Sequence, residues 1–241
     1  MLSNVILNIR IGFFLAIRQI QRASFWTTGL IIFVMILTFL NLVVVSGILV
    51  GIVQGMVDQT RHNFTSDVII SSPDYKKYIE NSPNLIALVE KLNGVKAVSP
   101  RYNDGAVLEA NYKTRKVNDK PNTANTQIYG IDPVAEDSVT NLSKTVTKGS
   151  YITSDDFDKV IVGQSLLSQY VVADNPNLAT LDNVTVGSKI RIRIGGSERE
   201  VIIKGIIFSK IRELARSVFM VGSQFRSMIG RNDGNVGQIA V

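Results

Sequence analysis

A run of 35 residues without a charged side chain, Ala23 to Val57, constrains most strongly what this chain can fold into. Arg22 precedes the run and Asp58 follows it. A helix needs about 20 apolar residues to cross a bilayer, so the run predicts a membrane-spanning helix over residues 23–57. Its extra length predicts that the last turns leave the bilayer as a stalk. The alternative, a cleaved signal peptide, has an apolar stretch of only about 7–15 residues.

The flanks of this span differ in charge and indicate its orientation. Arg10, Arg18 and Arg22 precede it, and no acidic residue does. Short flanks rich in Lys and Arg stay in the cytoplasm, so we expect the N-terminus inside and residues 58–241 outside the cell membrane. Trp26 lies near the inner end, where an indole favours the headgroup layer. We therefore predict that Arg10, Arg18, Arg22 and Trp26 lie at the membrane interface.

The first 22 residues have apolar side chains at intervals of three and four. This spacing is typical of an amphipathic helix, and we predict that residues 1–22 lie on the lipid bilayer at its cytoplasmic interface. The alternative is a short disordered leader with incidental spacing. The apolar positions are Leu2, Val5, Ile6, Ile9, Phe13, Ile17 and Ile20.

Inside the span, one amide and several glycines indicate contact with another helix. Asn41 places a polar group in hydrocarbon, where a side-chain hydrogen bond to a partner helix contributes about 0.6–2 kcal/mol. Gly47, Gly51 and Gly55 recur every four residues, which lets two helix backbones approach closely. We predict that Asn41, Gly47, Gly51 and Gly55 form a helix-packing face.

The outer part of the chain is nearly balanced in charge. The whole chain has 26 Lys and Arg residues and 20 Asp and Glu residues, and only three of these, all arginines, precede residue 58. Nucleic-acid binding usually needs a clustered basic face, so this balance argues against a nucleic-acid partner. The chain has no cysteine, which excludes disulfides and thiolate metal sites.

The sequence contains no recognisable constellation for catalysis. His62 is the only histidine, so the usual base of a catalytic triad and most zinc sites are missing. Asp155, Asp156 and Asp158 lack the glycine and closing glutamate of a calcium loop, and we interpret them as a solvated helix start. The basic stretch Lys113 to Lys120 is interpreted as a solvated hairpin tip. We therefore predict no catalytic, cofactor-binding or metal-binding residues and no enzyme activity.

Residues 58–241 alternate short strands with short helices, which predicts an α+β domain of mixed sheets. Asp132-Pro133 and Ser82-Pro83 each place proline at the first position of a helix, and Gly195-Gly196 predicts a hairpin. Two polar segments, 113–125 and 175–182, are expected to be loops, and their roles stay open. The expected strands are 68–70, 95–99, 105–112, 126–130, 160–162, 189–194, 201–208, 217–221 and 238–241, and the expected helices are 82–94, 132–142, 164–171 and 224–229.

Several local phrases resemble those of a known family, in the same order along the chain. With a basic amphipathic leader and a long first span, they make the chain similar to the MacB/FtsX-type permeases of ATP-binding-cassette (ABC) systems and their extracytoplasmic core domain. The resemblance covers nearly the whole chain. The phrases are Ser66–Ile70, Leu92–Arg101, Tyr129–Pro133, Lys148–Tyr151 with Val160–Leu167, Val186-Gly187 with Lys189–Ile194, and Lys204–Ile206.

This resemblance implies the transmembrane subunit of an ABC transporter of the export or mechanotransmission type. A separate ATPase subunit would bind on the inner side, and its cycle would move the outer domain. A homodimer, or pairing with a similar permease subunit, is expected. The alternative is a single-pass anchored binding or sensor domain without an ATPase partner. The transported substrate is not specified by the resemblance.

The chain also departs from the family's pattern. Family members continue after the outer domain into three more spans, whereas this sequence ends at Val241 within an expected strand. A strand that ends there would leave a sheet edge incomplete, so we expect a fragment of a longer permease. Ser188 stands where an aspartate is common after Val-Gly.

Overall fold

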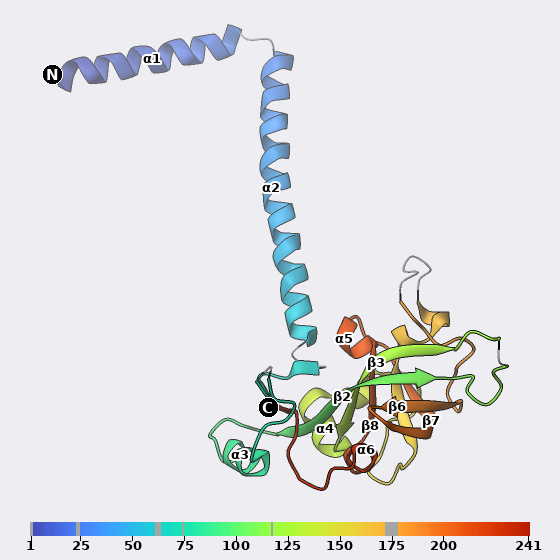
Figure 1. Cartoon of the computed structure of the whole chain (residues 1–241). Coiled ribbons are helices and arrows are strands. Elements are labelled where there is room, and N and C mark those ends of the chain that lie inside the picture. The colour runs from blue at the N-terminus through green and yellow to red at the C-terminus, as the bar shows by residue number, and fades with distance from the viewer. Residues whose placement is uncertain (1, 23–24, 61–63, 74, 117, 172–177) are drawn as a thin grey trace. The chain divides into compact units, whose positions relative to one another are not determined.

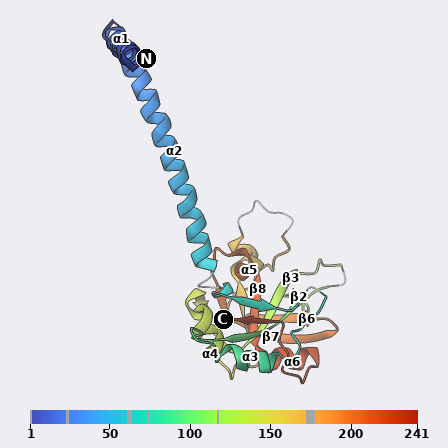
Figure 2. The same ribbon diagram turned by 90° about the vertical axis from the view of Figure 1, so that its left-hand side faces the viewer.

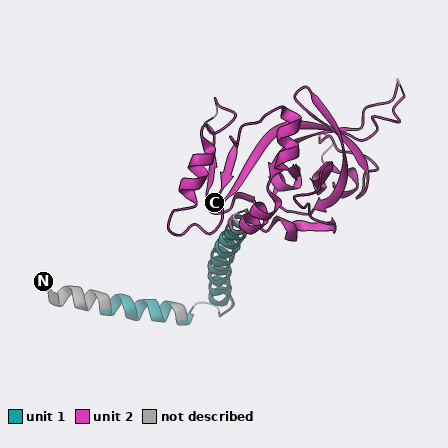
Figure 3. Ribbon diagram, turned by 90° about the horizontal axis from the view of Figure 1, so that it is seen from below, with its two compact units in different colours: residues 1–56 teal, residues 57–241 magenta. Residues whose placement is uncertain are grey.

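The computed structural model describes residues 2–22, 25–60, 64–73, 75–116, 118–171 and 178–241 (Figure 1). The chain divides into two compact units, residues 1–56 and 57–241 (Figure 3). His62 lies outside the described residues, as does part of the polar segment 175–182.

The first unit consists of helix α1 (Leu2–Arg22) and of helix α2 (Phe25–Thr60) up to residue 56, and the last turn of α2 belongs to the second unit. Within α2, Phe25–Gly55 is long and apolar enough to cross a membrane. A membrane span must satisfy its polar groups internally, and the Thr38 hydroxyl does so by donating to the Val34 carbonyl at 2.8 Å.

Six strands of the second unit pair in a closed ring, which we call the barrel. The ring runs β2–β3–β8–β5–β7–β6 and returns to β2, with parallel pairing only between β3 and β8 and between β5 and β7. Closure leaves none of the six strands as a fully open edge. The strands are β2 (Ser99–Glu109), β3 (Thr123–Ile131), β5 (Lys159–Gly163), β6 (Lys189–Ile194), β7 (Ser197–Ile207) and β8 (Ser217–Val221).

Three short strands and several helices surround the barrel. β1 (Ile69–Ser71) and β9 (Gln238–Ala240) extend the sheet beside the first residues of β2, and β4 (Val146–Gly149) pairs with β7. In both side views α5 and α6 lie on opposite sides of this unit (Figures 1 and 2). The helices are α3 (Ser82–Val89), α4 (Pro133–Thr140), α5 (Arg212–Ala215) and α6 (Gly222–Ile229), with 3-10 turns η2 (Leu142–Thr145), η3 (Gln164–Leu166) and η4 (Ser168–Tyr170).

Alternation along the strands divides the apolar side chains between two layers. In β6, Ile190, Ile192 and Ile194 are buried while the intervening basic side chains are not. The largest core cluster contains these isoleucines and lies in the barrel interior with α6 against it. A second cluster, which includes Phe64 and Phe219, covers the outer face of β3, β5 and β8.

Several sequence predictions are confirmed. The domain is α+β with a mixed sheet. The hairpin around Gly195-Gly196 joins β6 to β7. The helix after Asp132 forms as expected, because the Asp132 carboxylate accepts hydrogen bonds from the amides of Val134 and Ala135 at 2.9 and 3.2 Å.

Three predictions of local structure were wrong. The expected strands 95–99 and 105–112 are one strand, β2, which continues through Gly105. The expected helix 164–171 is two 3-10 turns, because Leu167 between them is extended and forms a bridge with Leu181. The helix expected to close at Gly94 ends at Val89.

The last strand is not a sheet edge. β9 lies between β1 and β2 and pairs with both, Ala240 facing Ile69 on one side and Ser99 on the other. The expectation of an incomplete edge at Val241 was therefore wrong.

Candidate functional site

A buried ion pair joins β2 to α4. Arg101 and Glu136 are 0% and 1% exposed. The guanidinium makes a two-pronged contact with the carboxylate, Nε to Oε2 at 2.8 Å and Nη2 to Oε1 at 2.6 Å. The hydroxyls of Ser99 and Thr140 donate to the same carboxylate at 2.7 and 2.9 Å. Buried charges need this degree of pairing, because removing them from water is costly.

The same arginine also contacts Phe64, the first described residue after α2. Arg101 Nη2 donates to the Phe64 carbonyl at 2.8 Å, and its guanidinium lies 5.4 Å from the centre of the Phe64 ring. That ring meets Tyr129 edge to face at 5.8 Å, and Tyr129 stacks on Phe219. Phe64 is four residues beyond Thr60, the last residue of α2. We call Phe64, Ser99, Arg101, Glu136 and Thr140 the anchor cluster.

Regular secondary structure sets the geometry of the anchor cluster. Ser99 and Arg101 are two residues apart on β2 and therefore point to the same face of the sheet. Glu136 and Thr140 are four residues apart on α4 and share one face of that helix. Each element thus presents two polar side chains to the same place, and Phe64 lies beside it.

A second set of contacts holds the segment that follows Phe64. The amides of Val68 and Val241 donate to each other's carbonyls at 3.2 and 2.9 Å, and the Ser66 hydroxyl donates to the Val241 carbonyl at 2.7 Å. β1 then pairs with β9, and β9 with β2. The first and last strands of the unit are therefore fixed to one another and to the strand that carries Arg101.

The predicted membrane residues lie on the two helices of the first unit. Arg10, Arg18 and Arg22 are exposed on α1, and Trp26 is exposed on the first turn of α2. Their contact with a membrane stays a prediction.

The predicted packing residues share one sector of α2. At 3.6 residues per turn, Asn41, Gly47, Gly51 and Gly55 span about 120° of the helix surface. Each of the three glycines borders open space. Their contact with another helix also stays a prediction.

The interpretation of the aspartate cluster as a solvated helix start was wrong. Asp156 is buried and pairs with Lys159 at 2.7 Å and with Lys204, while the Thr153 amide donates to it at 2.8 Å. Burial by itself raises the pKa of Asp156, but the two ammonium groups and the Thr153 hydrogen bonds outweigh burial and hold that pKa well below its usual range. Asp156 therefore fastens the loop before β5 to β7.

Two basic side chains of the expected solvated hairpin tip form ion pairs. Lys113 pairs with Glu200, and Arg115 pairs with Glu109 at 3.0 Å. Within the part of the chain that the structure describes, no group of three or more His, Asp or Glu side chains is placed to hold a metal ion.

Sequence reasoning missed the anchor cluster entirely. Its one sequence signal is an arginine, Arg101, two residues after a serine at the start of a strand. Nothing in the sequence shows that Glu136 faces this arginine, because the two are 35 positions apart and on different elements.

Comparison with known proteins identifies the family. The model of the MacB-like periplasmic core domain matches residues 28–241. The chain belongs to the MacB-like periplasmic core domain family. The predicted resemblance to MacB-type ABC transporter permeases is thereby confirmed.

Two solved structures are similar to this chain at low identity. The extracellular domain of the noncanonic ABC-type transporter YknZ from Gram-positive bacteria is 13% identical, with a TM-score of 0.45 over 71% of this chain and 79% of that one. The periplasmic region of MacB from Actinobacillus actinomycetemcomitans is 16% identical, with a TM-score of 0.42 over 71% of each chain. A search of curated protein sequences gives no match.

Membership in the MacB-like family sets the broad functional class. The chain carries the extracytoplasmic domain of an ABC transporter permease and a helix suited to anchor it in a membrane. Permeases of this family are typically not catalytic themselves, and the family implies an ATPase partner in general.

We predict that the anchor cluster is essential for stability. Glu136→Gln leaves the Arg101 guanidinium buried without a counter-charge, which we expect to lower the free energy of unfolding by about 3–5 kcal/mol. The double variant Arg101→Met with Glu136→Leu removes both charges, and we expect it to lower the free energy of unfolding less than Glu136→Gln alone does. Urea unfolding of the full chain in detergent micelles, followed by circular dichroism, measures both.

The matched control is Asp104→Asn, on the same strand. It breaks the ion pair between Lys77 and Asp104, whose side chains are 54% and 19% exposed, and we expect a cost below about 1 kcal/mol. If Glu136→Gln costs no more than Asp104→Asn, the anchor cluster does not hold the unit together.

Proposed function

We propose that this chain is the transmembrane subunit of an ABC transporter of the export or mechanotransmission type. A separate ATPase subunit hydrolyses ATP on the cytoplasmic side, and its cycle moves the extracytoplasmic unit. The observation that carries this proposal is the attachment of Phe64, four residues after α2, to a buried ion pair between β2 and α4.

The physical argument concerns how a movement of α2 reaches the barrel. A flexible linker between a helix and a domain absorbs movement, whereas a short segment fixed at both ends passes it on. The three positions 61–63 separate Thr60 from Phe64, and Phe64 is held through both its carbonyl and its ring. Breaking a buried ion pair costs several kcal/mol, so a load on Phe64 passes into β2 and α4 before the contact fails.

The strands around the anchor cluster distribute that load. β1 follows Phe64 within five residues and pairs with β9, which pairs with β2. β2 in turn pairs with β3 from Arg101 to Glu109 and with β6 at its far end. A displacement applied at Phe64 therefore moves the barrel as one body, without unfolding a single strand first.

The proposal assigns a role to each segment of the chain. Residues 1–22 form an amphipathic helix at the cytoplasmic interface, residues 23–57 the membrane span with its stalk, and residues 58–241 the extracytoplasmic core domain. Charge asymmetry supports this orientation, because Arg10, Arg18 and Arg22 all precede the span. α1 would then lie on the side where an ATPase is found.

Capture from native membranes tests the proposed ATPase partner. We expect an affinity-tagged full chain, purified in mild detergent after trapping with ATP and vanadate, to bring with it an ATPase that has a phosphate-binding loop. Glu136→Gln serves as the matched variant, since it weakens the outer unit but leaves α1 and α2 intact. It is expected to retain the ATPase. Purification of a folded chain without any ATPase would favour an anchored binding or sensor domain instead.

We also propose that two copies, or this chain and a similar permease subunit, pack through Asn41, Gly47, Gly51 and Gly55. The chain has no cysteine, so a single cysteine can report on this contact without background. Val44 lies within the sector of those four residues, whereas Val53 lies on the opposite side of the helix.

Cross-linking of the full chain in membranes tests this contact. Val44→Cys is expected to give dimers and Val53→Cys to give few. Adding Asn41→Leu and Gly51→Leu to Val44→Cys should reduce dimer yield at least fivefold, because leucine at position 51 keeps the backbones apart. Adding Val53→Leu, on the opposite side of the helix, is the control and should change little. Unchanged cross-linking in the Asn41→Leu, Gly51→Leu variant would show that the interface lies elsewhere.

A further inference from the structure

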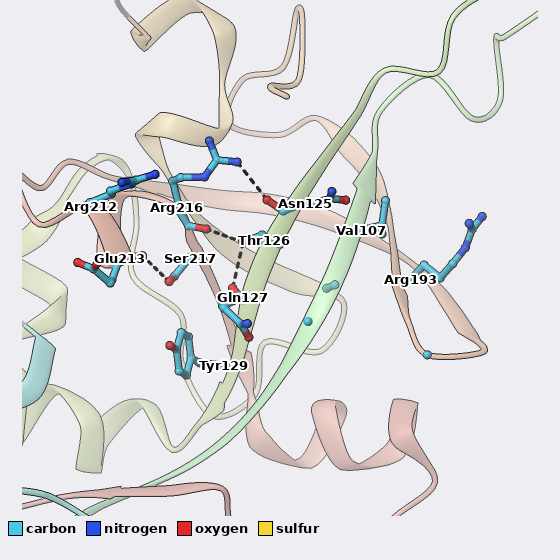
Figure 4. Close-up of a pocket in the computed structure, with 13 residues that line it drawn as sticks. Val107, Asn125, Thr126, Gln127, Tyr129, Arg193, Arg212, Glu213, Arg216 and Ser217 are labelled. Atoms are coloured by element: carbon cyan, nitrogen blue, oxygen red, sulfur yellow. Dashed lines mark hydrogen bonds between the residues drawn. The ribbon is translucent and has the colours of Figure 1, made fainter. Parts of the chain in front are cut away.

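A groove of about 650 Å³ crosses the outer face of β2 and β3 (Figure 4). Its floor consists of residues 105–107 of β2 and 125–127 of β3. Arg212 and Arg216, from α5 and the residue after it, lie on one side, and Arg193, at the end of β6, lies on the other (Figure 4). The groove therefore has arginines on both walls and polar strand residues beneath.

The two arginines near α5 lack a counter-charge. No ion pair joins Arg212 or Arg216 to a carboxylate among the residues that the structure describes. Arg216 Nη2 donates to the Asn125 carbonyl at 3.2 Å, while its Nη1 is buried and has no hydrogen-bond partner in that described part. Burial, and next the charge of Arg212, lower the pKa of Arg216 from its usual value. Glu213 is the one carboxylate that lines the groove.

On the opposite wall, the positive charge of Arg193 is partly neutralised by Glu198. Arg193 Nε donates to Glu198 at 2.6 Å. Arg193 is about half exposed, at 47% of its side chain. The groove thus contains one paired and two unpaired arginines against a single glutamate.

This arrangement favours an anionic occupant. A buried donor without an acceptor and two like charges close together both raise the free energy of the empty groove. A carboxylate in the groove offsets the repulsion between Arg212 and Arg216, and it accepts from the buried Nη1 once the Arg216 side chain turns toward the groove. Planar guanidinium groups suit carboxylates in particular, through paired hydrogen bonds.

We propose that this groove binds an acidic, extended segment of a partner protein. Carboxylates of that segment pair with Arg212 and Arg216 on one wall and with Arg193 on the other. An extended occupant is required because the arginines come from opposite walls, with two strands of floor between them. A single small anion reaches only one wall. This site is independent of the anchor cluster and of the proposed ATPase partner.

Binding of a fluorescent hexaglutamate peptide to the full chain in detergent micelles tests the proposal. We expect saturable binding by fluorescence anisotropy, weakened at least tenfold in the triple variant R193Q/R212Q/R216Q. Because Arg216 is half-buried, the double variant R193Q/R212Q, which changes only exposed residues, is measured beside it and should lose at least threefold. Circular dichroism verifies that each variant is folded.

The matched control is K91Q/K120Q/K144Q, which removes three exposed positive charges outside the groove. It is expected to change the affinity less than twofold. Equal weakening by this control would show that net charge alone attracts the peptide and would overturn the proposal. Inorganic phosphate or glycerol phosphate that displaces the peptide as effectively as unlabelled hexaglutamate would identify a small-anion or headgroup site instead.

Discussion

The buried ion pair between Arg101 and Glu136 is the contact on which the outer unit depends. It closes the space between β2 and α4, and it holds Phe64 by a hydrogen bond and a ring contact. A buried arginine is costly unless its charge is matched, so the carboxylate, two hydroxyls and the Phe64 carbonyl must all be in place together. Phe64, four residues after the end of α2, is therefore part of the core.

In the proposed function, the closed barrel carries a displacement of Phe64 to the whole second unit. β2 pairs with β9 at its first residues and with β6 at its last ones, and it pairs with β3 from Arg101 to Glu109. A strand shared among three neighbours spreads a local displacement over the whole sheet. The groove with Arg193, Arg212 and Arg216 lies on the outer face of this same strand pair. A partner bound there would accordingly move together with the unit.

Local signals in the sequence predicted much of the fold, whereas long-range contacts decided the candidate site. Asp132-Pro133 specifies its helix through a cap that the next residues satisfy, and Gly195-Gly196 specifies its hairpin, so both could be predicted. Two strands, 95–99 and 105–112, were predicted, but pairing with β3 continues from Arg101 to Glu109 and makes them one strand. Asp156 seemed solvated because its partner Lys204 lies 48 positions away. The Arg101–Glu136 pair was not predicted for the same reason, because its two residues are 35 positions apart.

The central claim is that the anchor cluster fixes the chain at Phe64 to the barrel, and we propose that this attachment carries movement of the long helix into the second unit. Electron–electron distance measurement between spin labels on Val57→Cys and Gly196→Cys tests it directly, since the chain has no other cysteine. A narrow distance distribution is predicted for the otherwise unchanged chain and for the surface variant Asp104→Asn, and a clearly broader one for Glu136→Gln. Distributions of equal width in all three would contradict the claim.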